Sequence, residues 1–313
     1  MSNIQDYLTD DINNFITTLQ KPDNPYYHLP AKTGVTDLGK SLNLGFSNFA
    51  IKTYYTTKKW EDFDDTKKYN WVSNINEFQV ETNQLPNNSF IDPPLLSFYK
   101  NPTVLKLTKR YIKKNLQFLN SINYESPEIE IEKMVRAETK QSISTLFQIG
   151  ERNKNIYLDF PHSEIEIQKF IDSFNWDFPW NAGAHFASLC VFSKTQLEES
   201  LFVKNKLILE KNILRYLSKE TGSYHNPSVA SSEEVINGAM KTISGLDWLN
   251  SEIHYPDTLI DFCLNNLSRD DGCHITDIVY VFYQCLKVTD HRKSEVIEYL
   301  ETLKAKIYTH YFP

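Results

Sequence analysis

The sequence predicts an all-α protein, built as a single-domain α/α toroid of about six helical hairpins. Residues 183–192 (GAHFASLCVF) and 275–286 (ITDIVYVFYQCL) are apolar nearly all round, which is typical of buried helices. Residues 103–119, 197–217 and 291–309 instead combine one apolar stripe with a charged back, so they should face water on one side. Short turns separate the two kinds, and strand-like alternation is scarce. This order indicates an inner ring of helices wrapped by an outer one.

Apolar spacing and capping residues place about twelve helices along the chain. Residues 1–35 hold a first helix and a lead-in, and 36–313 hold the hairpins. Thr36 and Asp37 begin the second helix as an N-cap and an acidic first-turn residue, and Pro256 suits the first position of another. No Pro- or Ser-rich linker divides the chain, which favours one domain. The expected helices span 3–20, 36–58, 66–83, 93–99, 103–121, 130–149, 163–174, 182–194, 196–218, 231–250, 256–268, 273–289 and 291–310. In the alternative interpretation, residues 84–102 form one long loop without the short helix 93–99.

Composition excludes several classes of protein. A formal net charge of -7 argues against a general nucleic-acid binder, and the basic run over residues 106–114 is interpreted as the wet face of one outer helix. Four cysteines in 313 residues do not make a disulfide framework. The N-terminus is acidic and lacks the apolar core of a signal peptide, and no run reaches about 18 apolar residues. We expect a cytoplasmic protein with no membrane span and no nucleic-acid partner, and we leave its oligomeric state open.

Two helix connections share one outline. Residues 216–224 and 266–274 each contain an outer-helix end, a few polar residues, a Gly, and then a small residue with an aromatic or His. They resemble the degenerate repeats (a Gln, three residues, then Gly-X-Trp) of the terpenoid cyclase and protein prenyltransferase superfamily. Ser218 and Ser268 stand where the Gln usually is, and Tyr224 where the Trp is. The resemblance extends over residues 36–290 and implies an α/α toroid, an architecture that glycoside hydrolases, uronate lyases and sugar epimerases also use.

Polar residues lie near the beginnings of four of the otherwise apolar helices. Buried polar groups without hydrogen bonds cost on the order of 1–3 kcal/mol each, so these residues either satisfy one another or face a wet cavity. In a toroid the inner helices start at one end, where their polar residues would line a funnel. The catalytic candidates are His185, His274, Asp277, Glu138 and Tyr280, and the substrate-binding candidates are Arg136, Trp180, Asn181, Asn237, Lys241 and Tyr224.

This set fits acid–base chemistry on a polar, sugar-derived substrate, including a uronate. His185 or Tyr280 would serve as base, while Arg136 and Asn181 neutralise a carboxylate. A carboxylate pair of the glycosidase kind, Glu138 with Asp277, is a further option. The expected partner is therefore a small molecule or a glycan, and we expect no metal or other cofactor.

Residues 62–66, Asp-Phe-Asp-Asp-Thr, give an alternative. They match the Asp-X-Asp-Asp-Thr motif of class II terpene cyclases, whose middle Asp, here Asp64, protonates an alkene or epoxide. Two lysines follow directly, however, and the hydrophilic surroundings favour a solvated loop in which Asp62, Asp64 and Asp65 precede a helix. A third alternative is a non-catalytic toroid that binds a glycan or a protein, which predicts a large exposed apolar or aromatic patch.

Residues 271–274, Asp-Gly-Cys-His, resemble the Asp-X-Cys part of the prenyltransferase zinc site. A catalytic zinc needs three protein ligands and an open position, and only His291 and His310 lie downstream. A chance spacing around a turn glycine is the favoured interpretation.

Overall fold

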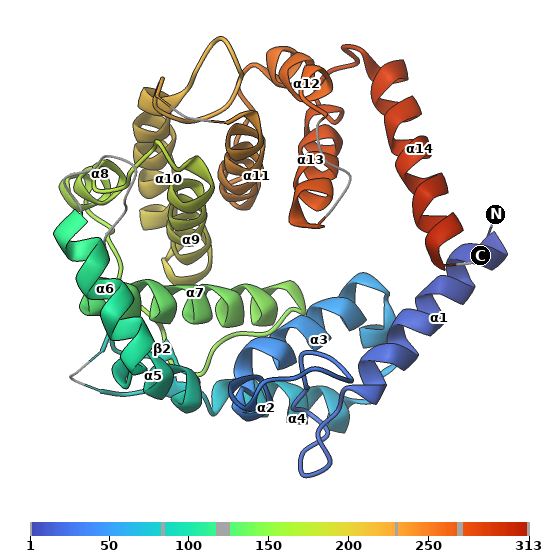
Figure 1. The fold of residues 1–313 in the computed structure, drawn as a ribbon, viewed down its shortest axis with the longest axis vertical. Helices are drawn as coiled ribbons and strands as arrows, with labels where there is room; N and C mark the ends of the chain where they lie inside the picture. The colour runs from blue at the N-terminus through green and yellow to red at the C-terminus, as the bar shows by residue number, and fades with distance from the viewer. Residues whose placement is uncertain (1, 83–84, 117–125, 229–230, 268–271, 312–313) are drawn as a thin grey trace. The chain divides into compact units, whose positions relative to one another are not determined.

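The computed structural model describes residues 2–82, 85–116, 126–228, 231–267 and 272–311 (Figure 1). Helices make up most of these residues, so the all-α prediction is confirmed. Within the same ranges, one short antiparallel pairing joins β1 (Gln79–Val80) to β2 (Ser89–Phe90). The chain divides into two compact units, Met1–Asp159 and Phe160–Pro313. The single-domain and toroid predictions stay predictions.

The first unit is organised around two helices, α3 (Leu44–Thr56) and α7 (Pro127–Gln148), which pack against each other. Helices α1 and α4 pack on α3, whereas α5 and β2 pack on α7. Its other helices are α1 (Ser2–Thr18), α2 (Asp37–Ser41), α4 (Asp65–Asn76), α5 (Pro93–Lys100), α6 (Val104–Leu116) and the 3-10 turn η1 (Lys59–Asp62).

The predicted helix 36–58 is wrong as one element, because the chain breaks between α2 and α3. Side chains distant in sequence stabilise the break. The Lys21 ammonium donates to the carbonyls of Lys40 and Leu42, at 2.5 and 2.9 Å. The Asp92 carboxylate accepts from the backbone N–H groups of Asn43 and Leu44, at 2.6 and 2.9 Å. These bonds replace those that a continuous helix would make, so local propensity alone could not reveal the interruption.

Helix α6 differs from its predicted role as an outer helix with one buried face. Its apolar stripe is exposed, with Val104 at 80% and Tyr111 at 71% of their full surface. None of its residues is buried. On the charged side, Lys106 and Arg110 both pair with Glu130 of α7. The helix is therefore attached through charges, and its apolar stripe faces solvent.

The second unit contains three helices that lie side by side, α9 (Pro179–Gln196), α11 (Ser232–Trp248) and α13 (Gly272–Cys285) (Figure 1). Helix α10 packs on α9 and α12 packs on α13, as expected for helical hairpins. Val296 of α14 enters the same apolar cluster as Leu259 and Phe282. The remaining elements are α8 (Glu164–Asp172), α10 (Glu199–Ile213), η2 (Leu214–Tyr216), α12 (Pro256–Asn265) and α14 (Lys293–Tyr311).

Glycines bring α9 and α11 into backbone contact. A Cβ added to Gly238 of α11 would lie 2.5 Å from Cβ and 2.8 Å from the carbonyl carbon of Pro179 on α9. One added to Gly245 would lie 3.0 Å from Cα of Ala187. Contacts between 238 and 179, and again between 245 and 187, show that the two helices run parallel. Their N-terminal ends therefore lie at the same end of the pair.

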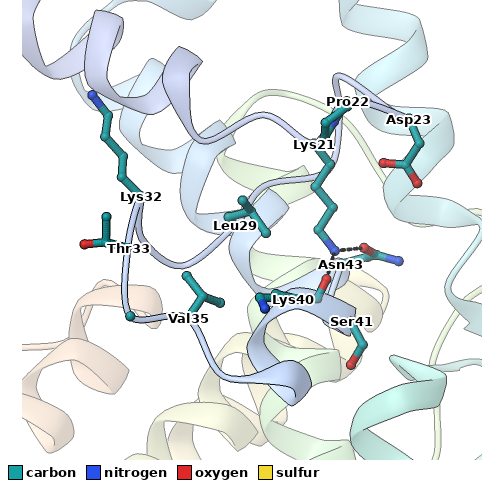
Figure 2. Close-up of a pocket in the computed structure, with 11 residues that line it drawn as sticks. Lys21, Pro22, Asp23, Leu29, Lys32, Thr33, Val35, Lys40, Ser41 and Asn43 are labelled. Atoms are coloured by element: carbon teal, nitrogen blue, oxygen red, sulfur yellow. Dashed lines mark hydrogen bonds between the residues drawn. The ribbon is translucent and has the colours of Figure 1, made fainter.

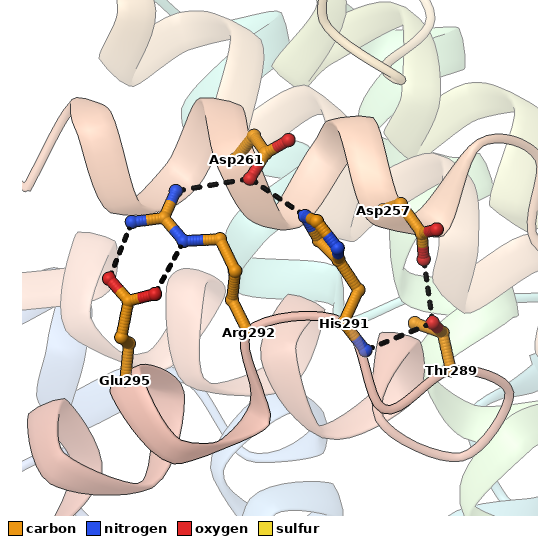
Figure 3. A network of polar contacts seen from close by, with 6 residues as sticks. All are labelled: Asp257, Asp261, Thr289, His291, Arg292 and Glu295. Atoms are coloured by element: carbon orange, nitrogen blue, oxygen red, sulfur yellow. Dashed lines mark hydrogen bonds and ion pairs between the residues drawn. The ribbon is translucent and has the colours of Figure 1, made fainter.

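A polar network fixes the start of α14 to α12 (Figure 3). Asp261 of α12 accepts from His291 Nε2 at 2.9 Å and from Arg292 at 3.0 Å, and Arg292 also forms a two-bond pair with Glu295. The hydrogen bond from His291, helped by Arg292, holds the pKa of Asp261 below its usual value. The network therefore closes the last hairpin of the unit with charge-assisted bonds.

We predict that Gly238→Ala lowers the free energy of unfolding by about 1–3 kcal/mol, because the new methyl group overlaps a proline and its backbone. Urea denaturation measures the change. Gly45→Ala in α3 is the matched control, since its Cβ would meet only Glu138 Oε1, at 3.7 Å. A Gly238→Ala protein as stable as the Gly45→Ala protein would contradict the backbone contact.

Candidate functional site

Three of the four helices that were predicted to begin with polar residues lie in the second unit, as α9, α11 and α13. The His274 ring Nδ1 lies 2.9 Å from Asn237 Oδ1, which connects α13 to α11. The Lys241 ammonium lies 5.5 Å from the centre of the Trp180 ring, which connects α11 to α9. We call this group the α9–α11–α13 cluster. Its members are Trp180, Asn181, Asn237, Lys241, His274 and Asp277.

The imidazole of His274 is held in one orientation and one tautomer. An amide oxygen only accepts hydrogen bonds, so the contact with Asn237 places the ring hydrogen on Nδ1. In that tautomer the lone pair lies on Nε2. This nitrogen is buried and has no hydrogen-bond partner in the part of the chain that the structure describes. His274 is thus a histidine fixed on one side by Asn237, and its Nε2 makes no hydrogen bond to the described residues.

Asp277 follows His274 by one helical turn, which puts both side chains on one face of α13. The side chain is 3% exposed, and its Oδ2 has no hydrogen-bond partner among the described residues. Burial raises the pKa of Asp277 to about 6, against the opposing effect of the Lys241 charge. A carboxyl group with such a pKa holds its proton closer to neutral pH than an exposed aspartate does, as a general acid requires.

The cluster also has partly exposed members. Trp180 is 46% exposed and Lys241 lies next to it, while Asn181 and Asn237 are partly buried. The backbone N–H of Trp180 donates to Glu234 Oε1 at 3.0 Å, which fixes the beginning of α9 against α11. An aromatic face, a cation and two amides therefore accompany the buried His–Asp pair.

The other predicted residues of the second unit are engaged by the protein. His185 is buried and its ring packs on Phe174, with centroids 5.0 Å apart. The Tyr224 side chain is fully buried and its hydroxyl lies 2.7 Å from His254 Nδ1. Tyr224 therefore presents no surface to a substrate, and its hydroxyl is already paired with His254.

Tyr280 is poorly suited to the base role that the sequence proposed for it. Its hydroxyl accepts from Gln284 at 2.9 Å and lies 3.4 Å from Asp247. Burial, reinforced by the Asp247 charge, raises the pKa of Tyr280 above its usual value. A tyrosine acts as base only after losing its proton, and these surroundings oppose that loss.

Arg136 and Glu138, the fourth predicted opening, lie on α7 in the first unit. Arg136 pairs with Glu132, one turn earlier on the same helix. Burial raises the pKa of Glu138 to about 7, and the nearby charge of Asp92 acts in the same direction. Because these residues belong to the other unit, the common funnel of four openings stays a prediction. So does the pairing of Glu138 with Asp277.

The sequence did not single out Asp92 or Lys52. Burial raises the pKa of Asp92, although its carboxylate caps the start of α3. Burial also lowers the pKa of Lys52 to about 8, and the Lys52 ammonium donates to Ser144 Oγ at 3.0 Å. One signal for Lys52 existed, because it is a lone lysine within an apolar helical run, residues 49–55 (FAIKTYY). Asp92 had no comparable signal, since acids before a proline are ordinary helix caps.

A hollow of about 640 Å³ lies beside the loop that follows α1 (Figure 2). Its lysines are occupied by the protein. Lys21 donates to Asn43 Oδ1 as well as to two carbonyls, Lys40 pairs with Asp37, and Lys32 lies over the Phe15 ring. Each of these three lysines therefore already makes a contact within the protein.

The Asp-Phe-Asp-Asp-Thr motif lies in an exposed helix connection. Asp64 is exposed, and its carboxylate accepts from the backbone N–H of Lys67 at 2.7 Å as the N-cap of α4. Asp62 pairs with Lys59 on the surface. The terpene-cyclase hypothesis required Asp64 at the base of an aromatic funnel, and an exposed capping residue does not meet that requirement.

Asp271, the first residue of the zinc-like motif, lies outside the described residues, as does Ser268. In the described part of the chain, no three His, Cys, Asp or Glu side chains are grouped so that they could hold a metal ion. His291 is instead paired with Asp261 (Figure 3). None of the described helices is long and apolar enough to cross a membrane.

No protein family, no curated protein and no solved structure matches this chain.

We predict a pH-dependent effect of Asp277→Asn. The native pKa of about 6 lies above the unfolded value of roughly 3.9, so the native state binds more protons between them. The free energy of unfolding should then fall as pH rises from about 4 to 7. Asparagine does not titrate, so the variant does not lose this stability. The free energy of unfolding of Asp277→Asn minus that of wild type should therefore be higher at pH 7.5 than at pH 5, by on the order of 1 kcal/mol. Urea denaturation at both pH values measures it, and a constant difference would contradict the raised pKa.

For the exposed motif, Asp64→Ala should lower the free energy of unfolding by about 1 kcal/mol through loss of the N-cap. Asp64→Asn retains a capping oxygen and should stay close to wild type. Thermal and urea denaturation compare the two variants. Equal losses in both would show that capping is not the role of Asp64.

Proposed function

We propose that the protein is an enzyme that moves protons on a polar, sugar-derived substrate bound at the α9–α11–α13 cluster. One observation carries the proposal. His274 is oriented by Asn237, its Nε2 makes no hydrogen bond to the described residues, and the protonatable Asp277 lies one helical turn away. A base and an acid on one helix face, each with an unused atom, make up the minimum set for general acid–base catalysis.

The proposed roles follow from the chemistry of each group. His274 Nε2 takes a proton from a substrate C–H or O–H, and Asp277 in its protonated form delivers one to a departing or newly formed oxygen. Lys241 neutralises a substrate carboxylate, as in a uronate, while the exposed Trp180 ring packs against the apolar face of a sugar. Asn181 and Asn237 supply amide groups for hydroxyls. This division of roles favours a lyase or an epimerase over a glycosidase, which needs a second catalytic carboxylate near Asp277.

We also propose that the helical hairpins belong to an α/α toroid. The parallel α9, α11 and α13, with α10 and α12 packed behind them, support this architecture in the second unit. A crystal structure with a bound sugar would test the toroid and the site together.

We predict that wild-type protein binds a neutral sugar or a uronate from a panel of monosaccharides and short uronate oligomers. Thermal-shift and calorimetric titrations detect binding, and ultraviolet absorbance of an unsaturated product detects uronate elimination. His274→Gln removes the base, so turnover should fall by about 100-fold or more. His162→Gln, which changes an exposed histidine of the same unit, is the control and should leave turnover unchanged.

Two outcomes would count against this function. Turnover that survives both His274→Gln and Asp277→Asn would place the chemistry elsewhere. Failure of every sugar and uronate to bind would favour the second candidate, a partner-binding protein. The exposed apolar stripe of α6 is the observation behind that alternative, because a contiguous apolar surface is typical of interaction sites.

A further inference from the structure

A second polar group lies between α3 and α7 of the first unit, and the proposed function makes no use of it. The Asn48 amide donates to Ser142 Oγ at 2.9 Å, and the Lys52 ammonium donates to Ser144 Oγ at 3.0 Å. Both α3 residues lie on one face, four positions apart. Ser144 Oγ in turn donates to the Gln141 carbonyl at 3.0 Å, so its oxygen is fixed toward Lys52. The ammonium is therefore positioned by the protein.

Lys52 carries a largely buried positive charge that has no carboxylate partner among the described residues. The Lys52 ammonium donates to the neutral Ser144 hydroxyl, and the charged group that affects the Lys52 pKa is another cation, Lys140. Burial and Lys140 together lower the pKa of Lys52 to about 8. A buried ammonium without a counter-charge is unfavourable, so the site gains free energy when an anion approaches.

The carboxylate of Glu138 does not fill this role. Glu138 Oε1 lies 3.7 Å from the Cβ position of Gly45, at the beginning of α3, whereas Lys52 lies about two turns further along that helix. The charge that influences the Glu138 pKa belongs to Asp92 and not to a lysine. The two acids therefore group at the start of α3, about two turns of that helix before Lys52.

The hydrogen-bonding groups around Lys52 favour an oxyanion. The Lys52 ammonium has three N–H bonds and uses one of them on Ser144. Gln141 lies on α7 one helical turn before Ser144, and its Nε2 is a buried donor without a hydrogen-bond partner in the described part of the chain. Asn48 Oδ1 is a buried acceptor, likewise without a partner there. A ligand with an anionic group and an adjacent hydroxyl would satisfy the donors and this acceptor together.

We propose that the α3–α7 face of the first unit is a binding site for a small oxyanion, a carboxylate or phosphate group carried next to a hydroxyl. Lys52 supplies the charge and Gln141 a hydrogen bond, Ser144 positions the ammonium, and Lys140 adds positive potential. The site is independent of the His274–Asp277 pair, so either can fail without the other.

Calorimetric titration of the full chain with inorganic phosphate, D-glucuronate and neutral glucose tests the proposal. Saturable binding of phosphate or glucuronate is expected, with no binding of glucose at this site. Lys52→Met should weaken anion binding by about tenfold or more, because a charged hydrogen bond is lost. Lys113→Met removes the same charge from an exposed position of α6 and should leave binding unchanged, as should His274→Gln. The anion that binds more tightly identifies the ligand as a phosphate or a carboxylate.

A second measurement avoids dependence on the variant's folding. Acetic anhydride labelling of wild-type protein, read by mass spectrometry, should modify Lys52 measurably in the free protein and more slowly when the anion is bound. Lys113 should be labelled equally with and without the anion. The proposal is overturned if neither anion binds wild type, if Lys52→Met binds as tightly as Lys113→Met, or if the anion leaves the labelling of Lys52 unchanged.

Discussion

The close approach of α9 and α11 is the constraint on which the second unit depends. Gly238 and Gly245 lack the side chain that would hold the helices apart, so α11 lies against Pro179 and Ala187 of α9. Contact at backbone distance fixes the sliding position of one helix relative to the other. That alignment places Trp180 beside Lys241, and the bond between Asn237 and His274 extends the same alignment to α13. The candidate site is thus a consequence of helix packing.

Both units contain buried polar side chains, and some of these are paired within the protein while others keep an unpaired atom. Tyr224 with His254 is a closed pair, and such a pair ties one segment to another. His274 and Asp277 each keep one buried atom without a partner among the described residues, and so do Gln141 and Asn48. Unmet hydrogen-bonding capacity is unfavourable in a folded protein. It occurs at other buried side chains too, such as Asn205, and we propose ligands at the two groups where it accompanies an acid–base pair or a buried cation.

The sequence predicted the helical class and most helices of the second unit, because apolar periodicity and caps such as Ser231 are local signals. It also singled out Asn237, His274 and Asp277 as polar residues at the beginnings of apolar helices, and the structure places Asn237 and His274 within hydrogen-bond distance. It failed where distant residues decide the outcome. Tyr280 looked like a candidate base, yet Asp247 and Gln284 engage its hydroxyl. Helix α6 looked half-buried, because an amphipathic pattern does not reveal whether another element covers the stripe. The meaning of Lys52 emerged only from the packing of α3 on α7.

The capping of α3 by Asp92 bears on how the chain folds during synthesis. Asp92 lies 49 residues after Asn43, and its carboxylate accepts a hydrogen bond from the Asn43 N–H group. The first turn of a helix central to the unit is therefore completed by a residue that leaves the ribosome well after that helix. Until then α3 has two uncapped amide groups and no α7 to pack on, so its stable folding must wait for distant chain. An early truncation product would contain the sequence of α3 without the means to hold its beginning.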